Sequence, residues 1–350
     1  MDSGAAAERI KARAREAGFD AAGVAPLAPA PTGAAYLRWL ERGDQAGLGY
    51  LERNVELRLD PRGLLPGARS ALAVALRYAP LVDEPEPPPG DFWPRVARYA
   101  RGVDYHDLIW RMLGEVARFV ESEWPGTRTR VCADTAPLLE RDLAVRAGLG
   151  AIGKNTNLLH PTLGSYVLLG ELLTTLDLPG DSPLSDLCGS CSRCLEACPT
   201  GALPEPWRLD ARRCISYWTI EHRGEIPDAI ARALAERVFG CDACQEVCPW
   251  NGGDPPADHP ELRLSDERRD LDLVGMLRMP TEELAARIRG SALRRVRAEG
   301  LRRNAAHALG GSAAPAARAA LAAAAADDPS SVVRSAAARA LAAGHPAPPD

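Results

Sequence analysis

Eight of the nine cysteines lie between residues 188 and 249, so thiolate chemistry in this chain is concentrated in one segment. The first run consists of Cys188, Cys191, Cys194 and Cys198, with Pro199 directly after it. In this spacing, C-x2-C-x2-C-x3-C-P, three cysteines hold one [4Fe–4S] cluster and the fourth reaches a second cluster. The run therefore predicts two clusters.

The remaining cysteines of the segment are Cys214 and a second run, Cys241, Cys244 and Cys248, which also ends in proline. Val238 stands where this run would be expected to begin with a cysteine, and Cys214 is the natural replacement. Each proline helps to end the turn after its cysteine, because it fixes φ and has no N–H. We predict a first cysteine set of Cys188, Cys191, Cys194 and Cys248, and a second cysteine set of Cys198, Cys214, Cys241 and Cys244.

Disulfides and structural zinc are the alternative uses of such cysteines. Nothing at the N-terminus resembles a signal peptide, so we expect a cytoplasmic chain whose thiols stay reduced. Zinc would use two CxxC pairs and would leave the first run unexplained. The spacing therefore favours clusters over both alternatives.

The length and composition set the wider frame. A chain of 350 residues can form two or three domains, each with its own core. Apolar runs all stay below the roughly 18 residues of a membrane span, so we expect no membrane association. The net charge of -5 argues against a uniformly basic surface. Lys154 is one of only two lysines in an arginine-rich chain, which suggests a position that needs a compact charge.

The first half of the chain shows helix and strand patterns that predict an α/β arrangement. Asp134 follows a predicted strand and precedes a predicted helix. A carboxylate at the carboxyl end of a strand in an α/β layer lies where ligands commonly bind, but an N-cap role is equally well supported. The expected helices are 5–17, 36–42, 49–56, 105–123 and 138–147, and the expected strands are within 18–27, 70–78, 128–133 and 165–176.

A glycine-rich stretch runs from Gly148 to Asn157 and contains a formal G-x-G-x-x-G match. It follows a helix pattern and lacks an acidic ribose partner, so we reject a dinucleotide site. The glycine backbone, Lys154 and two asparagines still offer donors to a phosphate or an amide-rich cofactor. A tight surface turn is the alternative.

The segment 209–224 and the C-terminal tail could both meet nucleic acid. The segment mixes aromatics and arginines with His222, which suits a cofactor pocket or a nucleic-acid contact. In the tail, the pattern of residues 301–309 recurs at 333–341, and this 32-residue offset is typical of a HEAT-type helix repeat. Between residues 282 and 307, seven arginines face three glutamates, which favours either phosphate binding or a solvated helix face.

Four motifs together resemble the epoxyqueuosine reductase family: VCADTAPLLERDLAVRAGLGAIGKNTNLL, CGSCSRCLEACPTGAL, CISYWTIEHRG and FGCDACQEVCPWN. The resemblance covers roughly residues 8 to 310. It implies an α/β + α fold with three parts. These are a cobalamin-binding catalytic domain of the nitroreductase/reductive-dehalogenase type over residues 1–178, a two-[4Fe–4S] ferredoxin-like module over 179–255, and a short HEAT-like helical repeat over 256–350 that helps to hold tRNA.

The resemblance also implies an activity, the reduction of epoxyqueuosine to queuosine in the wobble position of tRNA. Electrons from an external low-potential donor would pass through the two clusters to base-off cobalamin in a monomeric enzyme. The family's proton donor corresponds to Asp134, and we expect burial in an apolar cavity to raise its pKa so that it can act near neutral pH. His106 lies in Asp-x-His but without the following signature of a cobalt-ligating histidine, which suits cobalamin with no lower histidine ligand.

The resembling motifs suggest further contacts. We expect His222 to touch tRNA, and Cys132, the cysteine outside the cluster segment, to be a buried strand residue. The expected cobalamin contacts are Arg58, Arg98, His106, Asp134, Lys154, Asn155, Asn157, Ser216, Arg223, Gly240, Cys241, Asp242 and Ala243.

Two other functions fit parts of the sequence. A reductive dehalogenase would use the same metals on small halogenated compounds, but those proteins usually carry a twin-arginine export signal, and none is visible here. A non-enzymatic ferredoxin-like electron carrier with a helical tail would give no purpose to the first 180 residues or so, or to Asp134. The basic patch in the tail favours the tRNA enzyme.

Overall fold

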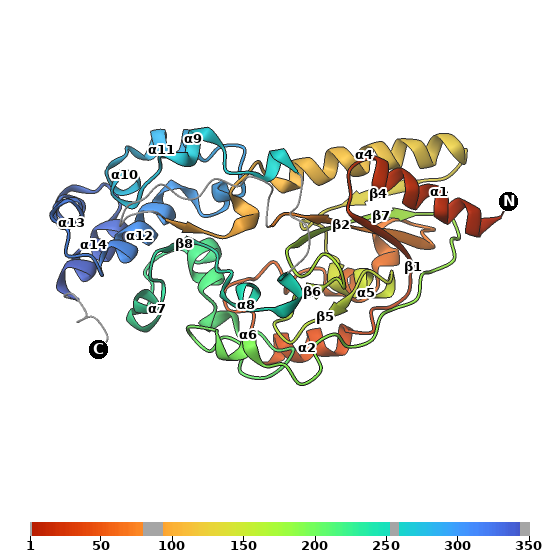
Figure 1. The fold of residues 1–350 in the computed structure, drawn as a ribbon, viewed down its shortest axis with the longest axis horizontal. Helices are drawn as coiled ribbons and strands as arrows, with labels where there is room; N and C mark the ends of the chain where they lie inside the picture. Colours follow the sequence, from red (N-terminus) through yellow and green to blue (C-terminus); the bar gives the residue numbers. More distant parts are fainter. Residues whose placement is uncertain (1, 80–93, 253–258, 344–350) are drawn as a thin grey trace.

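The computed structural model describes residues 2–79, 94–252 and 259–343, with the backbone alone at 266 and 267 (Figure 1). Helices and strands alternate in the first half, short helices surround the cysteines, and helices dominate the end. The elements that position the site are β1 (Ala21–Pro26), β2 (Ser70–Arg77), β3 (Arg95–Val96), β4 (Thr129–Cys132), β5 (Ala151–Ile152), β6 (Leu158–Leu159), β7 (Val167–Thr174), β8 (Arg237–Phe239), α1 (Ser3–Glu16), α2 (Gly33–Glu41), α4 (Tyr105–Glu123), α5 (Glu140–Arg146), α6 (Arg193–Glu196), α7 (Asp228–Ala233) and α8 (Ala243–Glu246). The tail adds α9 (Asp266–Arg269), α10 (Leu273–Arg278), α11 (Thr281–Arg287), α12 (Arg297–Leu309), α13 (Pro315–Asp327) and α14 (Ser331–Ala342).

The main sheet has the strand order β1-β2-β7-β4, and each neighbouring pair is antiparallel. The mixed α/β character that the sequence predicts is confirmed. The strand-end rule that we applied to Asp134 belongs to parallel sheets. It does not explain the position of Asp134 here, because β7 runs opposite to β4.

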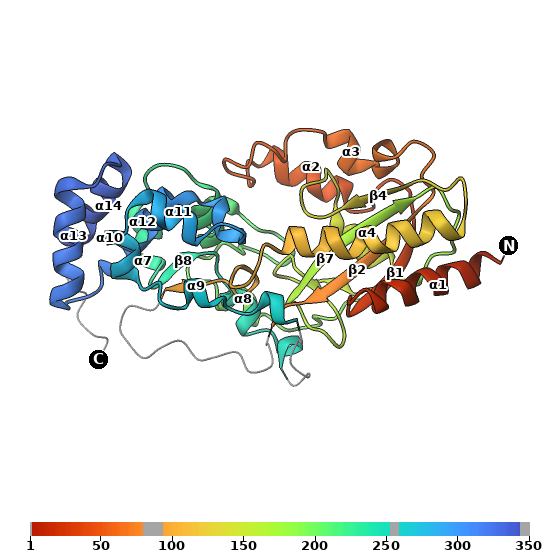
Figure 2. The same ribbon diagram turned by 90° about the horizontal axis from the view of Figure 1, so that it is seen from above.

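Both faces of this sheet are covered by apolar side chains. Along β2, Leu72, Val74 and Leu76 pack with α1 and α4, whereas Ala71, Ala73 and Ala75 face α5. This alternation is the two-residue period of a strand, and it explains why all eight residues of β2 are buried. The small alanines let α5 lie close to the sheet. Figure 2 shows α1 and α4 side by side along the sheet.

Most of the predicted elements are present within a few residues of their expected bounds. The helix expected over 49–56 is wrong, because turns occupy the chain up to Asn54 and only α3 (Val55–Leu59) follows. Asn54 has a φ of 56°, which places it in the left-handed region that a right-handed helix cannot include. Cys132 is fully buried at the end of β4, as predicted.

The cysteine segment lies between the sheet and the tail helices (Figure 1). Its strand β8 pairs in parallel with β3, which comes from the first half of the chain. Val238 and Phe239 of β8 are also part of the apolar core of α10 and α12–α14. The three parts of the chain therefore share core contacts. Across the described ranges, no helix combines the length and apolar character needed to cross a bilayer.

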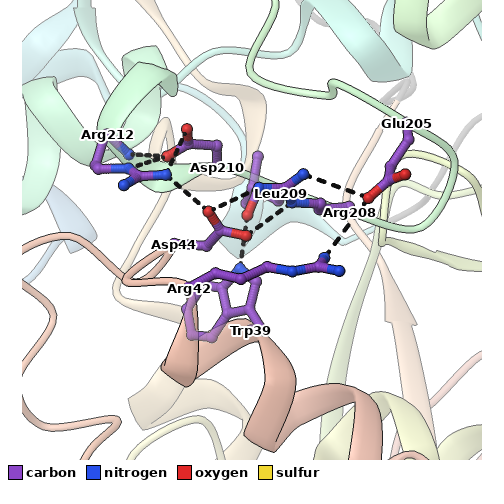
Figure 3. A network of polar contacts seen from close by, with 8 residues as sticks. All are labelled: Trp39, Arg42, Asp44, Glu205, Arg208, Leu209, Asp210 and Arg212. Carbon is purple, nitrogen blue, oxygen red and sulfur yellow. Dashed lines mark hydrogen bonds and ion pairs between the residues drawn. The ribbon is translucent and has the colours of Figure 1, made fainter.

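A buried carboxylate joins the first part of the chain to the segment before Cys214 (Figure 3). Asp44, whose side chain is fully buried, accepts hydrogen bonds from Arg208 Nε at 2.8 Å and from Arg212 at 2.9 Å. Trp39 Nε1 donates to the carbonyl oxygen of Leu209 at 2.6 Å. Asp210 binds Arg212 from the other side at 2.8 Å. These contacts fix the chain immediately before it reaches Cys214.

Candidate active site and cluster ligands

The cysteines of the two predicted sets line two different cavities. All four side chains of the first cysteine set line one cavity of about 260 Å³, together with Lys154 and Trp250. All four of the second cysteine set line another cavity, of about 370 Å³. All nine cysteines are free thiols. The grouping in space is the one that the spacing predicts.

The surroundings of the sulfur atoms suit cluster ligands. The backbone N–H of Lys154 points at Cys188 Sγ at 3.4 Å, and that of Ala202 donates to Cys198 Sγ at 3.2 Å. Such N–H groups stabilise cluster thiolates and help to set their potential. Among the described residues, no three His, Cys, Asp or Glu side chains are grouped as ligands of a single metal ion. Four cysteines around a cavity fit a multi-iron cluster, which needs room between its ligands.

Asp134 lines the same cavity as the second cysteine set. Its φ of 52° places it in the left-handed region, and the N–H of Thr135 donates to the carbonyl oxygen of Ala133 at 2.5 Å across it. Asp134 is therefore the centre of a tight three-residue turn. The N-cap position of α5 is Leu139, so the N-cap alternative for Asp134 is wrong. The turn directs its carboxylate into the cavity.

Three side chains hold Asp134 in place. The hydroxyl of Tyr105 donates to Asp134 Oδ2 at 3.0 Å, and His106 Nε2 lies 3.0 Å from the same oxygen. On the backbone side, Glu140 Oε1 accepts the N–H of Asp134 at 2.5 Å. The side chain of Asp134 nevertheless stays 57% exposed, because the cavity opens in front of it. A substrate could thus reach a carboxylate whose orientation is fixed.

Asp134 and Glu140 are neighbouring carboxyl groups whose pKa values move in opposite directions. The surrounding protein partly removes Asp134 from water, which favours its neutral form, but the hydrogen bond and charge of His106 and the hydrogen bond of Tyr105 outweigh this effect and hold the pKa of Asp134 below its ordinary value. The expectation of a raised pKa is therefore wrong. Burial and the charge of Asp134 instead raise the pKa of Glu140 to about 8. At neutral pH, Glu140 is the neutral member of the pair.

The cavity also presents amide and hydroxyl groups to any cofactor beside the second cysteine set. These donors suit the amide-rich edge of a corrin ring, whereas a small apolar ligand would leave them unpaired. The lining includes Asn155, Asn157, Ser165, Ser216 and Gln245. Cobalamin therefore fits the chemistry of the lining.

Seven of the expected cobalamin contacts line this cavity, namely Asp134, Asn155, Asn157, Ser216, Cys241, Asp242 and Ala243. Arg98 and Gly240 line an adjoining cavity of about 370 Å³. This cavity shares Ala97, Cys241 and Asp242 with the cavity of Asp134. The backbone N–H of Arg98 donates to Asp242 Oδ2 at 2.8 Å, which joins the two cavity walls.

Lys154 lines the cavity of the first cysteine set and binds the loop that carries Cys188 and Cys191. Its Nζ donates to the carbonyl oxygens of Gly189 and Cys191 at 2.7 and 2.8 Å, and its side chain is mostly buried. Since it does not line the cavity of Asp134, its place differs from the expected one. The compact positive charge that the composition suggested is used to bind two backbone carbonyl groups of the loop from Cys188 to Cys191.

Four other expected site residues also lie away from the cavity wall. His106 is behind Asp134 instead of beside the cofactor space. Arg58 donates to the carbonyl oxygens of Leu138 and Tyr50, each at 3.4 Å. Arg223 donates to the carbonyl oxygens of Arg295 and, at 3.4 Å, Val296, directly before α12. His222 Nε2 lies 2.9 Å from the carbonyl oxygen of Glu225 and packs on Trp218 at the end of a π-helix, Tyr217–Glu221.

Sequence reasoning missed Tyr105 and Glu140 as site residues. Tyr105 begins α4, and its neighbour His106 drew attention only as a cofactor contact. Glu140 lies six positions after Asp134, in the first turn of the helix that the sequence predicts there. The sequence signal that could have been used is a second acidic residue, six positions after Asp134 and beyond the turn that contains Pro137, because such a turn can bring the two residues together.

Comparisons with known proteins agree with this geometry. The family model described as epoxyqueuosine reductase QueG, DUF1730, matches residues 58–135, and the 4Fe-4S double cluster binding domain matches residues 187–251. The epoxyqueuosine reductase of Xanthomonas campestris pv. campestris is 38% identical over 348 residues, which covers 96% of this chain and 96% of that protein. The epoxyqueuosine reductase of Synechococcus sp. (strain CC9605) is 42% identical over 307 residues, which covers 86% of this chain and 94% of that protein.

A solved structure agrees with the fold as well. A crystal structure of epoxyqueuosine reductase with an epoxyqueuosine-modified tRNA-Tyr stem loop superposes with a TM-score of 0.88 at 33% identity, and covers 95% of this chain and 88% of that one. The two family models cover Asp134 and the cysteine segment, and the relatives match most of the chain. The chain belongs to the epoxyqueuosine reductase family.

Proposed function

We propose that this protein is an oxidoreductase that reduces epoxyqueuosine to queuosine in the wobble position of tRNA. One observation carries the proposal: a single cavity is lined both by the second cysteine set and by Asp134. Ligands for an electron-transfer cluster thus meet an acid–base group at one place. A reduction that consumes electrons and protons together needs that arrangement.

The reaction takes up two electrons and two protons for each epoxide, and yields a carbon–carbon double bond and one water. When bound, two [4Fe–4S] clusters and base-off cobalamin supply the low-potential electrons. The two cysteine sets hold the clusters. Asn155, Asn157, Ser216 and the stretch 241–243 hold the cobalamin, a role supported by their position in the lining of the cavity.

Asp134 gives a proton to the epoxide oxygen as its carbon–oxygen bond breaks. Asp134→Asn keeps the shape of the residue and removes the acid, and asparagine tolerates the left-handed turn. We expect normal iron and cobalamin contents and a loss of turnover of about 10²- to 10⁴-fold. Measured turnover close to that of the unchanged protein would remove Asp134 from the mechanism.

The wider assignments follow from the same proposal. The domains are 1–178 for cobalamin and catalysis, 179–255 for the clusters and 256–350 for tRNA, the last with a HEAT-like repeat built on α12, α13 and α14. His222 contacts the tRNA. An external low-potential donor reduces the clusters of a monomeric enzyme, which acts in the cytoplasm, where its tRNA substrate is found.

The test is an anaerobic assay with reconstituted clusters, cobalamin, a chemical reductant and tRNA that carries epoxyqueuosine. We expect queuosine in the digested tRNA, and none when cobalamin is omitted. If clusters are reduced but no queuosine forms, the proposal is wrong and the electron-carrier alternative gains support. A parallel reaction with a halogenated phenol tests the dehalogenase alternative, for which we expect no halide release.

A further inference from the structure

A chain of four charged side chains leads from the C-terminal part of the protein to Asp134. Arg294 Nε lies 2.9 Å from Asp104 Oδ2, and Asp104 Oδ1 lies 2.6 Å from His106 Nδ1. The other ring nitrogen of His106, Nε2, lies 3.0 Å from Asp134 Oδ2. His106 is therefore held between two carboxylates, one of which faces the cavity.

The geometry of this chain is fixed by burial and by the start of α4. Asp104 is 1% exposed and is the N-cap of α4, where its Oδ1 also accepts the backbone N–H of His106 at 3.2 Å. The His106 ring stacks on Tyr105 with a centroid distance of 4.1 Å. Because both its nitrogens are directed and its face is covered, the imidazole has little freedom to turn.

The charges place the mobile proton on His106. Burial alone lowers the pKa of His106, but the hydrogen bonds and charges of Asp104 and Asp134 raise it to about 9. In turn, the hydrogen bond and charge of His106, with the hydrogen bond of Tyr105, keep the pKa of Asp134 below its ordinary value. At neutral pH, the resting pair is an imidazolium and a carboxylate, so Asp134 alone has no proton to give.

We propose that His106 supplies the proton that Asp134 delivers, and that Asp104 is a positioning residue that keeps His106 charged and directed at Asp134. The inference rests on the proposed function. It changes the place of His106 from a cofactor contact to a group that acts through Asp134. Arg294 extends the chain to the tail helices by holding Asp104.

The proton balance of the step is simple. The Nε2–H bond of His106 breaks and an O–H bond forms at Asp134 Oδ2; that O–H bond then breaks as the proton passes to the epoxide oxygen, and Asp134 is again a carboxylate. The electrons come from the external reductant of the proposed reaction. The neutral imidazole keeps its Nδ1–H on Asp104, so only one tautomer forms. His106 then takes its next proton from water, ready for the second proton that the reaction consumes.

Other charged groups around His106 come from three elements. Tyr105 shares Asp134 with it from α4, and Glu140 of α5 lies on the backbone side of Asp134. Arg294 and Arg295 come from the 3₁₀ turn Ala292–Arg295 before α12. Asp104 is the group whose removal changes the charge on His106 without touching Asp134.

The first test is the pH profile of Asp104→Asn in the reconstituted enzyme. For the unchanged protein, we expect activity to fall as the pH rises through about 9, because His106 then loses its proton. Without the charge of Asp104, the pKa of His106 drops toward its ordinary value, so the fall moves down by about one pH unit or more. Superimposed profiles at equal iron and cobalamin contents would overturn the proposal.

The second test is chemical rescue of His106→Ala with added imidazole. We expect a strong loss of activity with unchanged cobalamin binding, and recovery that follows the imidazolium fraction of the buffer. Loss of cobalamin affinity without rescue would instead make His106 a cofactor contact and overturn the proposal. If this variant does not fold, the Asp104→Asn profile decides alone.

A matched control separates this site from histidine–aspartate pairs in general. His259 Nε2 lies 3.0 Å from Asp20 Oδ2, the same distance as in the active pair, but neither residue lines the cavity. Asp20→Asn should leave the pH profile unchanged. Failure of the proposed function is distinct, since the unchanged holoenzyme would then form no queuosine at any pH.

Discussion

Each of the two cysteine sets consists of four cysteines, but the surroundings of the two sets differ. The second cysteine set shares its cavity with Asp134 and Ser216, where the reaction is proposed. The first cysteine set lies beside Lys154 and Trp250, and its Cys188 and Cys191 also line an open groove formed by residues 186–193. From this difference we expect electrons to flow from the first set, which lines the open groove, to the second set, which lines the cavity of Asp134.

The largest expected effect comes from removing one ligand from each set in turn. Cys214→Ser should lose the second cluster, about half of the iron, and all detectable turnover, because the cluster beside the cavity is gone. Cys191→Ser should lose the same amount of iron but leave the spectrum of the second cluster. Iron analysis and electron paramagnetic resonance of the reduced proteins measure this. Unchanged cluster content in Cys214→Ser would refute its assignment as a ligand.

Lys154→Met tests the surroundings of the first cysteine set alone. The substitution keeps an unbranched side chain that is one atom shorter, and removes the donors to the carbonyl oxygens of Gly189 and Cys191. We expect the first cluster to be lost about 10-fold faster to a chelator, within the range for groups behind metal ligands. The second cluster should be unaffected. Equal loss from both clusters would mean that the two sets are not independent.

The smallest effect concerns stability near the second cysteine set. Asp44→Ala leaves Arg208 and Arg212 without their buried acceptor, just before Cys214. Breaking a fully buried pair costs about 3–5 kcal/mol, but both arginines reach solvent, so we expect about 2 kcal/mol of lost unfolding free energy. Urea unfolding measures it, with the second cluster released first.

The exposed pair of Asp177 and Arg69 provides the control for this measurement. Asp177→Ala should change the unfolding free energy by less than about 0.5 kcal/mol, because exposed ion pairs contribute little. A similar loss of unfolding free energy in both variants would show that the buried network near Cys214 stabilises the protein no more than an exposed ion pair does.

The sequence allowed good prediction wherever local pattern decides the outcome. The strand of eight buried residues at β2, the helix α4 and the cysteine sets follow from periodicity and spacing. The position of Lys154 did not, since the carbonyl groups that bind it belong to a loop more than 30 residues later and leave no signature in the sequence. The pKa of Asp134 was also beyond reach. Its direction depends on His106, which comes near only when α4 packs against the turn after β4.

The left-handed backbone of Asp134 limits which residues can replace it, and so separates shape from acidity in a mutational series. Asparagine and glycine accept this conformation at little cost, whereas most other side chains are strained there by about 1–2 kcal/mol. Asparagine thus preserves the turn without the acid, and glutamate preserves the acid in a strained turn. Variation at this one position, scored for both folding and turnover, would show which of the two properties the reaction requires.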